Sequence, residues 1–472
     1  MNRRLAAGLV GLALAGKLIL LAVLLGRGPG PGFYVDSETY LGPARSLLET
    51  RSFAAAPGRA DEPELVRTPG YPAFLSLVLV VFGERLWVVS ALGACLSAAT
   101  ALALLVLFAE PFGARTAAWA AVLLSFEPGS FCRSLEILSE TLFALLLVLG
   151  LAAIVAFVGR PVTRPAVAFL GGLALAVATL VRPILVFLLP VLALLLLAVL
   201  LARRAPGLRI AAAVLAFLIP PALLVGGWMA RNARAAGAFS LAPVSGHQLL
   251  HRRAAAVVAR VEGVPITLAQ ERLGIREAFY RFRGPAAEAE LFGGRRYQDV
   301  FPGTAGLGVY ELDRKWRREA MEIFRAHPLA TLAVTARGSL LLLLSPPSLI
   351  LAPRYGLVRP GPEIQRLYDE QEIGALARRL ASGHPFLFAV SLLLVLQLLA
   401  LLVLALRGAL RSWRPGRRAA QAVLLVSAGY LIASSSSTDA ADDRYRVPLM
   451  PVVCLYAAAG LVVPNVSTMG RS

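Results

Sequence analysis

Three polar residues follow closely on the first apolar segment of the chain: Asp36, Glu38 and Tyr40, in the stretch FYVDSETYLGPARSLL. Anchoring in a bilayer does not require carboxylates at this place, so these acids need another role. A carboxylate within hydrogen-bond reach of a hydroxyl can act as a general base. Tyr40 would share the face of Asp36 over one helical turn and could orient the carboxylate or a substrate. These residues are therefore candidates for catalysis; the alternative is that Asp36 only caps the turn, which contributes about 1 kcal/mol.

A second set of polar residues flanks later apolar segments. Arginine suits phosphate because its planar fork donates two parallel, permanently charged hydrogen bonds. Each residue taken alone is more often an interfacial anchor or a member of an ion pair. Together they lie on one side of the membrane under the span assignment below, which predicts an assembled site for an anionic group. The set consists of Arg67 and Tyr71 (RTPGYP), Glu136 and Glu140 (LEILSETLF), Arg182 (LVRP), Arg231 (WMARN), and Arg444, Tyr445 and Arg446 (DDRYRVPLMP).

The composition determines the class of protein that must position these residues. Hydrophobic residues make up 58% of the chain, charged residues only 16%, and the mean hydropathy is +0.71. With repeated apolar runs of about 20 residues, these values indicate a polytopic helical membrane protein. Runs of consecutive leucines exclude the alternation of a membrane β-barrel. The net charge of +19 is almost all arginine, much of it in short loops, which indicates membrane topology and not nucleic-acid binding.

The apolar runs predict about ten crossings, with Arg3 and Arg4 in the cytoplasm and the segment around Asp36 outside. Lys17 interrupts the first span and is expected to face other helices or to extend toward the head groups. A short apolar piece, Ala73–Phe82, is expected to lie in the interface. The crossings are the N-terminal segment, Leu86–Phe108, Ala117–Phe126, Leu138–Val158, Ala166–Val181, Ile184–Leu201, Ile210–Met229, Phe386–Leu406, Ala420–Ala433 and Val447–Val463.

Three regions follow from this assignment: a transmembrane catalytic module (1–230) with a first outer loop (26–85), an extracytoplasmic loop region (231–327), and a C-terminal interfacial and transmembrane segment (328–472). Within the loop region, apolar residues at a spacing of three to four predict an amphipathic helix over 309–324, packed on the membrane, on the bundle or on its own domain. Leu329–Ser345 contains Arg337 at its middle, and we expect it to lie in the outer interface, because this arrangement keeps the basic stretch Arg407–Arg418 inside.

Metal and redox signals are weak. Cys95, Cys132 and Cys454 have no metal-ligand or redox spacing. His247 and His251 stand four apart but lack an acidic partner in an H-E-x-x-H pattern. The sequence therefore predicts no metal ligands and no certain cofactor, although a divalent metal remains possible.

Several short motifs, in a fixed order, resemble a known family. DSETYLGPARSLL, RTPGYPAFLSLVLVVFG, LSETLF, LVRP, RN and RYRVPLMP occur in the order seen in bacterial membrane glycosyltransferases of the C superfamily (GT-C). The chain is similar to the branch that contains protein O-mannosyltransferases and the lipid A aminoarabinose transferase, and the similarity runs through nearly the whole chain. In this family an acid in the first outer loop, shortly before a tyrosine, is catalytic, and it corresponds to Asp36. The family's paired acids are split in DSE, which makes Glu38 the second member.

The resemblance implies an all-α, polytopic GT-C bundle with interfacial helices and a large extracytoplasmic loop. It implies a multi-pass protein of the bacterial inner (plasma) membrane, with its active site on the extracytoplasmic side. It also implies an inverting transfer of a sugar from a polyprenyl-phosphate donor to a hydroxyl or amine on a glycolipid, polysaccharide or protein. The absence of a Rossmann-like unit in the sequence also favours a lipid-linked donor over a nucleotide sugar. Membrane lipid is a further expected partner, and nucleic acid is not.

Two other classes of function compete with this interpretation. A lipid or polysaccharide transporter or flippase would have charges near the midplane, broken helices and internal repeats. Lys17 is the main deep charge, and the sequence shows no repeat. A non-catalytic assembly subunit would leave the clustered acids and arginines without a role.

Overall fold

The computed structural model describes residues 1–26, 32–34, 36–59, 61–160, 164–284, 287–355, 361–436 and 442–462. Within these residues every regular element is a helix, and the only β pairing is an isolated bridge between Ala54 and Pro63. The predicted all-α fold is therefore confirmed.

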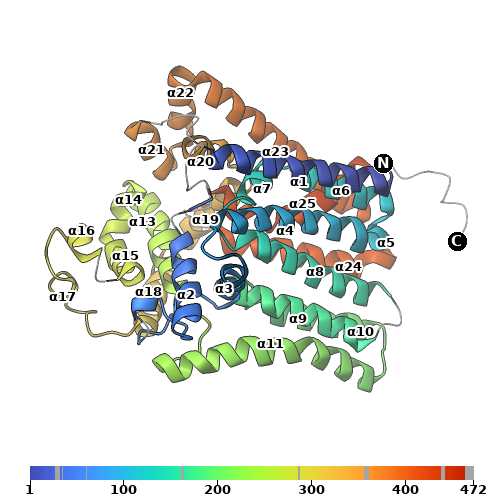
Figure 1. Cartoon of the computed structure of the whole chain (residues 1–472), viewed down its shortest axis with the longest axis horizontal. Helices are drawn as coiled ribbons and strands as arrows, with labels where there is room; N and C mark the ends of the chain where they lie inside the picture. Colours follow the sequence, from blue (N-terminus) through green and yellow to red (C-terminus); the bar gives the residue numbers. More distant parts are fainter. Residues whose placement is uncertain are drawn as a thin grey trace, which may run out of the picture.

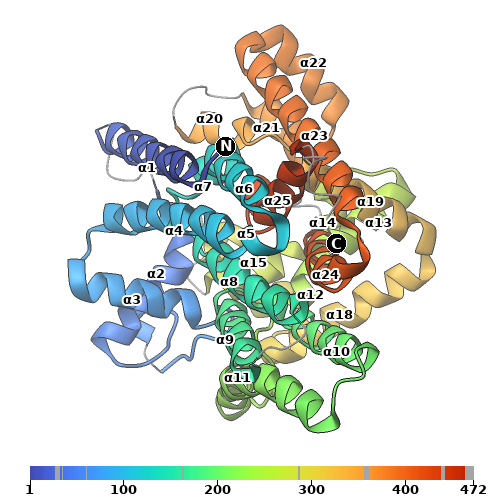
Figure 2. The same ribbon diagram turned by 90° about the vertical axis from the view of Figure 1, so that its right-hand side faces the viewer.

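Ten helices run side by side along the long axis of the molecule and form a bundle (Figure 1). Seen along the bundle, from the end at which the N-terminus lies, α25 is beside α6, α24 is beside α8, and α23 packs on α25 (Figure 2). The N-terminal and C-terminal parts of the chain therefore build one unit. The ten helices are α1 (Arg3–Leu25), α4 (Leu86–Leu107), α6 (Ala114–Phe126), α8 (Glu140–Gly159), α9 (Pro165–Val181), α10 (Leu188–Ala202), α11 (Gly207–Ala236), α23 (Pro385–Ser412), α24 (Arg418–Ser435) and α25 (Met450–Leu461).

Not all of these helices are long enough to cross a bilayer by themselves. Among the described residues, six segments are long and apolar enough: α1, α4, α8, Pro183–Ala202, α11 and α23. The shorter α6, α9 and α25 are apolar helices inside the bundle. The ten expected segments thus all form bundle helices, while the number of crossings stays a prediction. The end of the last expected span, Val463, lies outside the described residues.

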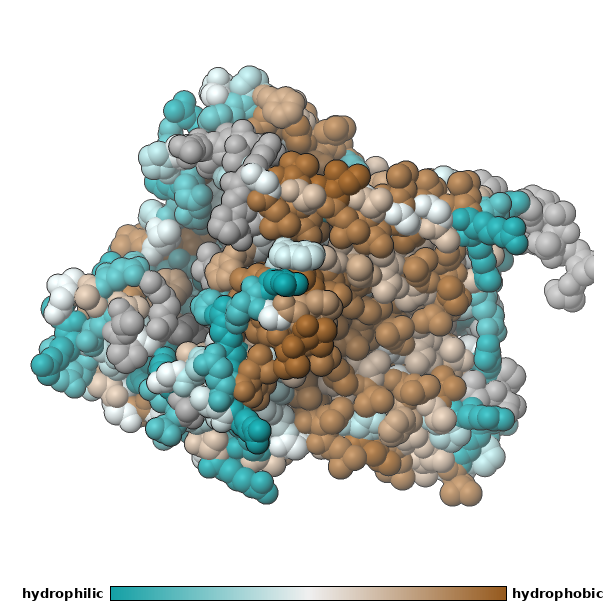
Figure 3. All heavy atoms as spheres, in the orientation of Figure 1, coloured by the Kyte–Doolittle hydropathy of each residue, from teal (hydrophilic) through white to brown (hydrophobic). Residues whose placement is uncertain are grey.

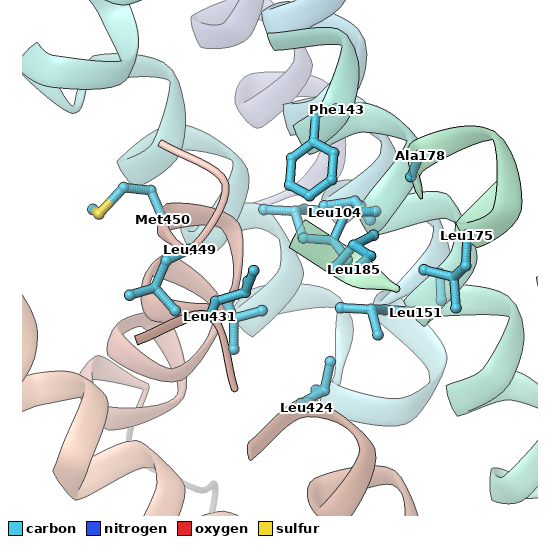
Figure 4. Packing of buried hydrophobic residues seen from close by; sticks show 14 of the residues in the cluster. Leu104, Phe143, Leu151, Leu175, Ala178, Leu185, Leu424, Leu431, Leu449 and Met450 are labelled. Atoms are coloured by element: carbon cyan, nitrogen blue, oxygen red, sulfur yellow. The ribbon is translucent and has the colours of Figure 1, made fainter. Parts of the chain in front are cut away.

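The surface of the bundle has the polarity that a bilayer requires. Apolar side chains cover the visible face of the bundle as a continuous belt, and hydrophilic residues gather at its two ends (Figure 3). Inside, Phe143 and Leu151 of α8 face Leu424 and Leu431 of α24 across the core (Figure 4). Each bundle helix is thus apolar on the side that faces lipid and on the side that faces other helices, as expected for a helix in a membrane.

Two glycines allow α23 and α25 to touch. A Cβ on Gly408 would come within 1.9 Å of the carbonyl oxygen of Tyr456, and one on Gly460 within 2.2 Å of that of Leu404. Such close backbone approach is typical of helix pairs in membranes, where small residues permit dense packing. It holds the C-terminal half of α25 against α23.

Lys17 lies inside the bundle. Its side chain is 1% exposed, and Nζ donates a 2.6 Å hydrogen bond to Ser97 on α4. Nζ also lies over the ring of Phe131 in α7 (Pro128–Arg133), 5.3 Å from the centroid. Of the two predicted arrangements, Lys17 therefore faces other helices.

Short helices cross one end of the bundle instead of running along it (Figure 1). They include α2 (Ser37–Glu49) and α3 (Gly70–Phe82), the latter matching the short apolar piece of the sequence. These helices form the layer that carries Asp36 and Arg67. The others are α19 (Pro328–Leu344), α20 (Ser348–Arg354), α21 (Pro362–Asp369) and α22 (Ile373–Gly383).

The segment between α11 and α19 is a small helical domain at the same end. Its last helix, α18 (Val309–Ala326), is amphipathic as predicted, and it packs on its own domain through Leu312, Trp316 and Ala320. A bend of 107° separates α18 from α19. Arg337, in the middle of α19, donates to Gln371. The domain also contains α12 (Ser245–His247), a π-helix (Gln248–Ala254), α13 (Ala255–Glu262), α14 (Ile266–Arg272), α15 (Ile275–Arg283), α16 (Glu288–Phe292) and α17 (Tyr297–Val300).

Candidate active site at one end of the bundle

Asp36 lies at the N-terminus of α2 and faces two arginines. Its Oδ2 is 2.7 Å from Nη1 of Arg444, and its Oδ1 is 3.4 Å from Nη2 of Arg67. Within the described residues, the carboxylate makes no capping hydrogen bond to the first turn of α2. The side chain is 31% exposed, so a reactant can reach it. Asp36 is thus an ion-pair partner of two arginines and not a helix cap, and its catalytic role stays a prediction.

Arg67 is held beside Asp36 by residues of α2. Its Nε donates to Thr39 Oγ1 over 2.9 Å, and its Nη1 donates to Tyr40 Oη over 3.1 Å. The guanidinium also stacks on the ring of Tyr40, 4.4 Å from the centroid. Tyr40 in turn packs edge-on against Tyr71, with ring centroids 5.1 Å apart. Tyr40 therefore orients Arg67, and through it the carboxylate of Asp36.

Arg444 reaches Asp36 from the turn before α25. Asp443–Arg446 forms a 3₁₀ turn. Nη2 of Arg444 donates to Tyr445 Oη over 2.8 Å, and Nε is 3.1 Å from Asp442 Oδ2. The rings of Tyr34 and Tyr445 lie 4.9 and 4.7 Å from its guanidinium carbon. Aromatic faces and carboxylates thus fix this cation with its Nη1 directed at Asp36.

Arg182 supplies a third guanidinium, which lies next to Tyr445. Arg182 ends α9, and its Nη1 is 2.5 Å from Oε1 of Glu140 at the start of α8. Its guanidinium carbon is 5.8 Å from the centroid of the Tyr445 ring. In the described part of the chain, Oε2 of Glu140 is buried without a hydrogen-bond partner.

A glycine brings the Arg67 segment against α9. A Cβ on Gly70 would lie 2.7 Å from the backbone of Leu180 and Val181, so only glycine fits without displacement. This contact explains the glycine of the RTPGYP motif. It brings Tyr71 and Arg67 to the end of α9 that carries Arg182.

The charges around Asp36 favour its ionised form. Burial alone would raise the pKa of this carboxyl, but Arg444, Arg67 and Arg182 outweigh burial and lower the pKa below its usual value of 3.8. Asp36 is therefore a carboxylate at neutral pH and has the capacity to accept a proton.

A buried ion cluster fastens the Asp443–Arg446 turn to α7. Arg133, whose side chain is 1% exposed, lies 2.6 Å from Asp443, 2.8 Å from Asp442 and 2.9 Å from Glu136. Glu136, predicted to bind substrate, is thus a partner of Arg133. Arg133 and Asp443 were not among the predicted site residues, although the spacing of Arg133 and Glu136 is typical of a local ion pair.

Three further predicted residues have partners away from Asp36. Glu38 is 59% exposed and pairs with Arg45 at 2.9 Å. Arg231 donates to the carbonyl oxygens of Glu64 and Phe53. Arg446 donates to the carbonyl oxygens at 342 and 345, near the end of α19. The structure brings together Asp36, Tyr40, Arg67, Tyr71, Glu140, Arg182, Arg444 and Tyr445.

Among the described residues, no group of three or more His, Cys, Asp or Glu side chains is placed to hold a metal ion. His247 and His251 face each other at 3.2 Å between their Nδ1 atoms, and His251 Nε2 contacts the carbonyl oxygen of Leu273 at 2.9 Å. Burial lowers the pKa of His251 to about 4, aided by Arg252 and Lys315. The pair belongs to the core of the small domain.

No protein-family model and no curated protein sequence matches the chain. Several solved structures do match the chain. The archaeal oligosaccharyltransferase AglB from Archaeoglobus fulgidus, in complex with an inhibitory peptide and a dolichol-phosphate, is 13% identical with a TM-score of 0.47 over 95% of this chain. ArnT from Cupriavidus metallidurans, bound to undecaprenyl phosphate, is 15% identical with a TM-score of 0.40 over 96% of this chain and 78% of its own.

The chain spans about half the length of the oligosaccharyltransferase, 50% of that chain. Both neighbours are GT-C glycosyltransferases, the class that the resemblance in the sequence named. At these identities the likeness concerns the fold.

Proposed function

We propose that this protein is an integral-membrane glycosyltransferase that moves a sugar from a polyprenyl-phosphate donor to a hydroxyl or amine of an extracytoplasmic acceptor. The observation that carries the proposal is Asp36, an accessible carboxylate held between Arg67 and Arg444 at the end of an apolar bundle. A base beside fixed cations, at the boundary of lipid and water, suits a lipid-linked phosphate donor and an aqueous acceptor.

The donor phosphate binds between the guanidiniums of Arg444, Arg182 and Arg67. Arg444 and Arg182 flank one tyrosine ring, and Arg67 lies on the other side of Asp36. Guanidinium forks bind phosphate oxygens in pairs. Arg444 now donates to Asp36, and an incoming phosphate competes for this donor and releases the carboxylate for proton transfer.

In the transfer step, the acceptor oxygen or nitrogen attacks the anomeric carbon while Asp36 takes its proton. The bond between the anomeric carbon and the phosphate oxygen breaks, and its electron pair leaves with the polyprenyl phosphate. The arginines stabilise the negative charge that develops on this leaving group. Because attack and departure occur on opposite faces, the configuration of the sugar inverts.

Aromatic residues and Glu140 form the sugar side of the site. The rings of Tyr40 and Tyr71 adjoin, and Glu140 holds Arg182 through Oε1. Tyr445 lies next to two of the cations.

The orientation of the bundle supports an extracytoplasmic site in a bacterial inner membrane. The C-terminal end of α8 and the loop that joins α10 to α11 lie at the end opposite to α2 (Figure 1). Arg160 and Arg203 meet there, where Arg203 donates to the Arg160 carbonyl oxygen over 3.0 Å. Arginine-rich short loops stay in the cytoplasm, so the end with Asp36 faces outward. The deep charge expected of a transporter, Lys17, donates a hydrogen bond to Ser97 inside the bundle.

Mass spectrometry of the cell envelope tests the function. Glycolipids and glycoproteins are compared between a deletion strain and strains that carry the wild type, Arg444→Ala or Arg414→Ala. We expect one glycan to lose a sugar in the deletion strain. The wild type and the exposed control Arg414→Ala should restore this sugar, and Arg444→Ala should not restore it. An unchanged set of glycans after deletion would refute the proposal.

A further inference from the structure

Arg67 belongs to a loop that is fixed by contacts outside the active site. Residues 53 and 64 approach each other through the bridge between Ala54 and Pro63 and through a 2.9 Å hydrogen bond from Glu64 N to the carbonyl oxygen of Phe53. The chain then turns sharply toward Arg67. The conformation of this loop therefore decides where the Arg67 guanidinium lies.

Arg231 fastens this loop to the end of α11. Nη1 donates to the carbonyl oxygen of Glu64 over 2.8 Å, and Nη2 donates to that of Phe53 over 3.1 Å. The guanidinium carbon is 4.8 Å from the centroid of the Trp228 ring and 5.7 Å from that of Phe53. These two rings also pack edge-on, with centroids 5.1 Å apart. The Arg231 guanidinium thus contacts both sides of the bridge.

The side chain of Glu64 sets the backbone that leads to Arg67. Oε1 accepts hydrogen bonds from the amides of Val66, over 2.6 Å, and Arg67, over 2.8 Å. The residue is only 8% exposed. Two part-buried amides share one carboxylate oxygen, and loss of that acceptor would leave both without this hydrogen bond, so the turn has little freedom.

We propose that Glu64 and Arg231 are positioning residues for the phosphate-binding site: Arg231 holds the loop on α11, and Glu64 directs the backbone so that Arg67 meets Asp36. The inference rests on the proposed function, in which Arg67 contacts the donor phosphate. It reassigns Arg231, which the sequence suggested as a phosphate ligand, to a role exerted through Arg67. It also links the beginning of the small extracytoplasmic domain to the site, because Arg231 lies near the end of α11 from which that domain starts.

Hydrogen exchange measures the positioning itself on the purified full-length protein. In Glu64→Ala the backbone amides of residues 65–68 should exchange at least about tenfold faster than in the wild type. In Glu64→Gln the side-chain oxygen still accepts hydrogen bonds, so these amides should exchange at a rate near that of the wild type. Arg231→Ala should speed exchange over 53–67. The matched control is Arg253→Ala, which removes another guanidinium that donates to backbone carbonyls, those of Ala433 and Ser436. Unchanged exchange over 65–68 in Glu64→Ala would overturn the proposal, whatever the protein binds.

Binding of undecaprenyl phosphate shows whether the position of Arg67 matters for the site. We expect Glu64→Ala and Arg231→Ala to weaken binding about tenfold, and Glu64→Ala to add less than about twofold in an Arg67→Ala background, because the two residues act through one guanidinium. Full additivity in the double variant would instead assign Glu64 a merely structural role and contradict the inference. The positioning role would be refuted if Arg67→Ala weakened binding and Glu64→Ala did not. The phosphate site itself would stand in that case. Failure of the wild type to bind the lipid would count against the proposed function, and the exchange rates would still decide the positioning.

Discussion

Replacement of Asp36 by asparagine keeps the shape of the side chain and removes its ability to take a proton. An amide oxygen can still accept from Arg444, now at 2.7 Å from the carboxylate, so the geometry of the site should persist. The ion pairs with Arg444 and Arg67 are lost. With a side chain that is 31% exposed, this loss should cost about 1–2 kcal/mol of folding free energy, toward the lower part of the range for charged hydrogen bonds.

The effect on transfer should be much larger than the effect on folding. A positioned general base contributes a rate factor on the order of 100 or more, which corresponds to about 2.7 kcal/mol of activation free energy. Asp36→Asn should therefore reach normal levels in the membrane and transfer sugar at about one hundredth of the wild-type rate or less.

The assay follows the glycan that the deletion strain lacks, in membranes that carry equal amounts of each variant. Glu49→Gln provides the matched control, because it removes an exposed carboxylate from the opposite end of the same helix. Near-normal turnover by Asp36→Asn would refute the assignment of Asp36 as the base. Equal losses in Asp36→Asn and Glu49→Gln would point to a general effect of charge on α2.

Three more outcomes are expected. Arg133→Ala leaves Asp443 and Glu136 buried without their cation, so it should lower stability by about 3–5 kcal/mol and reduce the melting temperature in detergent, whereas Arg160→Ala at an exposed pair should barely change it. The arginine neighbours of Asp36 lower its pKa below 3.8, so the carboxylate should stay ionised at neutral pH and the transfer rate should fall only below about pH 4. The ion pairs that stabilise the fold are lost over the same acidic range. A decrease of the transfer rate near pH 6 would contradict this prediction. In a Cys95→Ser background, Glu49→Cys should react with an impermeant thiol reagent in intact cells and Arg414→Cys only after permeabilisation; the reverse pattern would invert the topology.

Composition and hydropathy were enough to predict the class of structure. The length and polarity of its apolar runs require helices that satisfy their own backbone hydrogen bonds in lipid, and all ten expected segments form helices of the bundle. Local signals were also sufficient for the amphipathic helix at 309–326 and the short apolar helix at 70–82, since both depend on side-chain periodicity over a few turns.

Which of the polar candidates meet depends on how distant segments pack together. Asp36 and Arg444 are 408 positions apart in the chain, and their contact depends on how the segment before α25 packs against α2. Glu38, two residues from Asp36, points instead to Arg45, because successive helical positions face different directions. Arg231 and Arg446 have the same chemistry as Arg444 but donate to backbone carbonyls. Residue type limits what a side chain can bind, whereas its direction and its distant partners follow from helix packing.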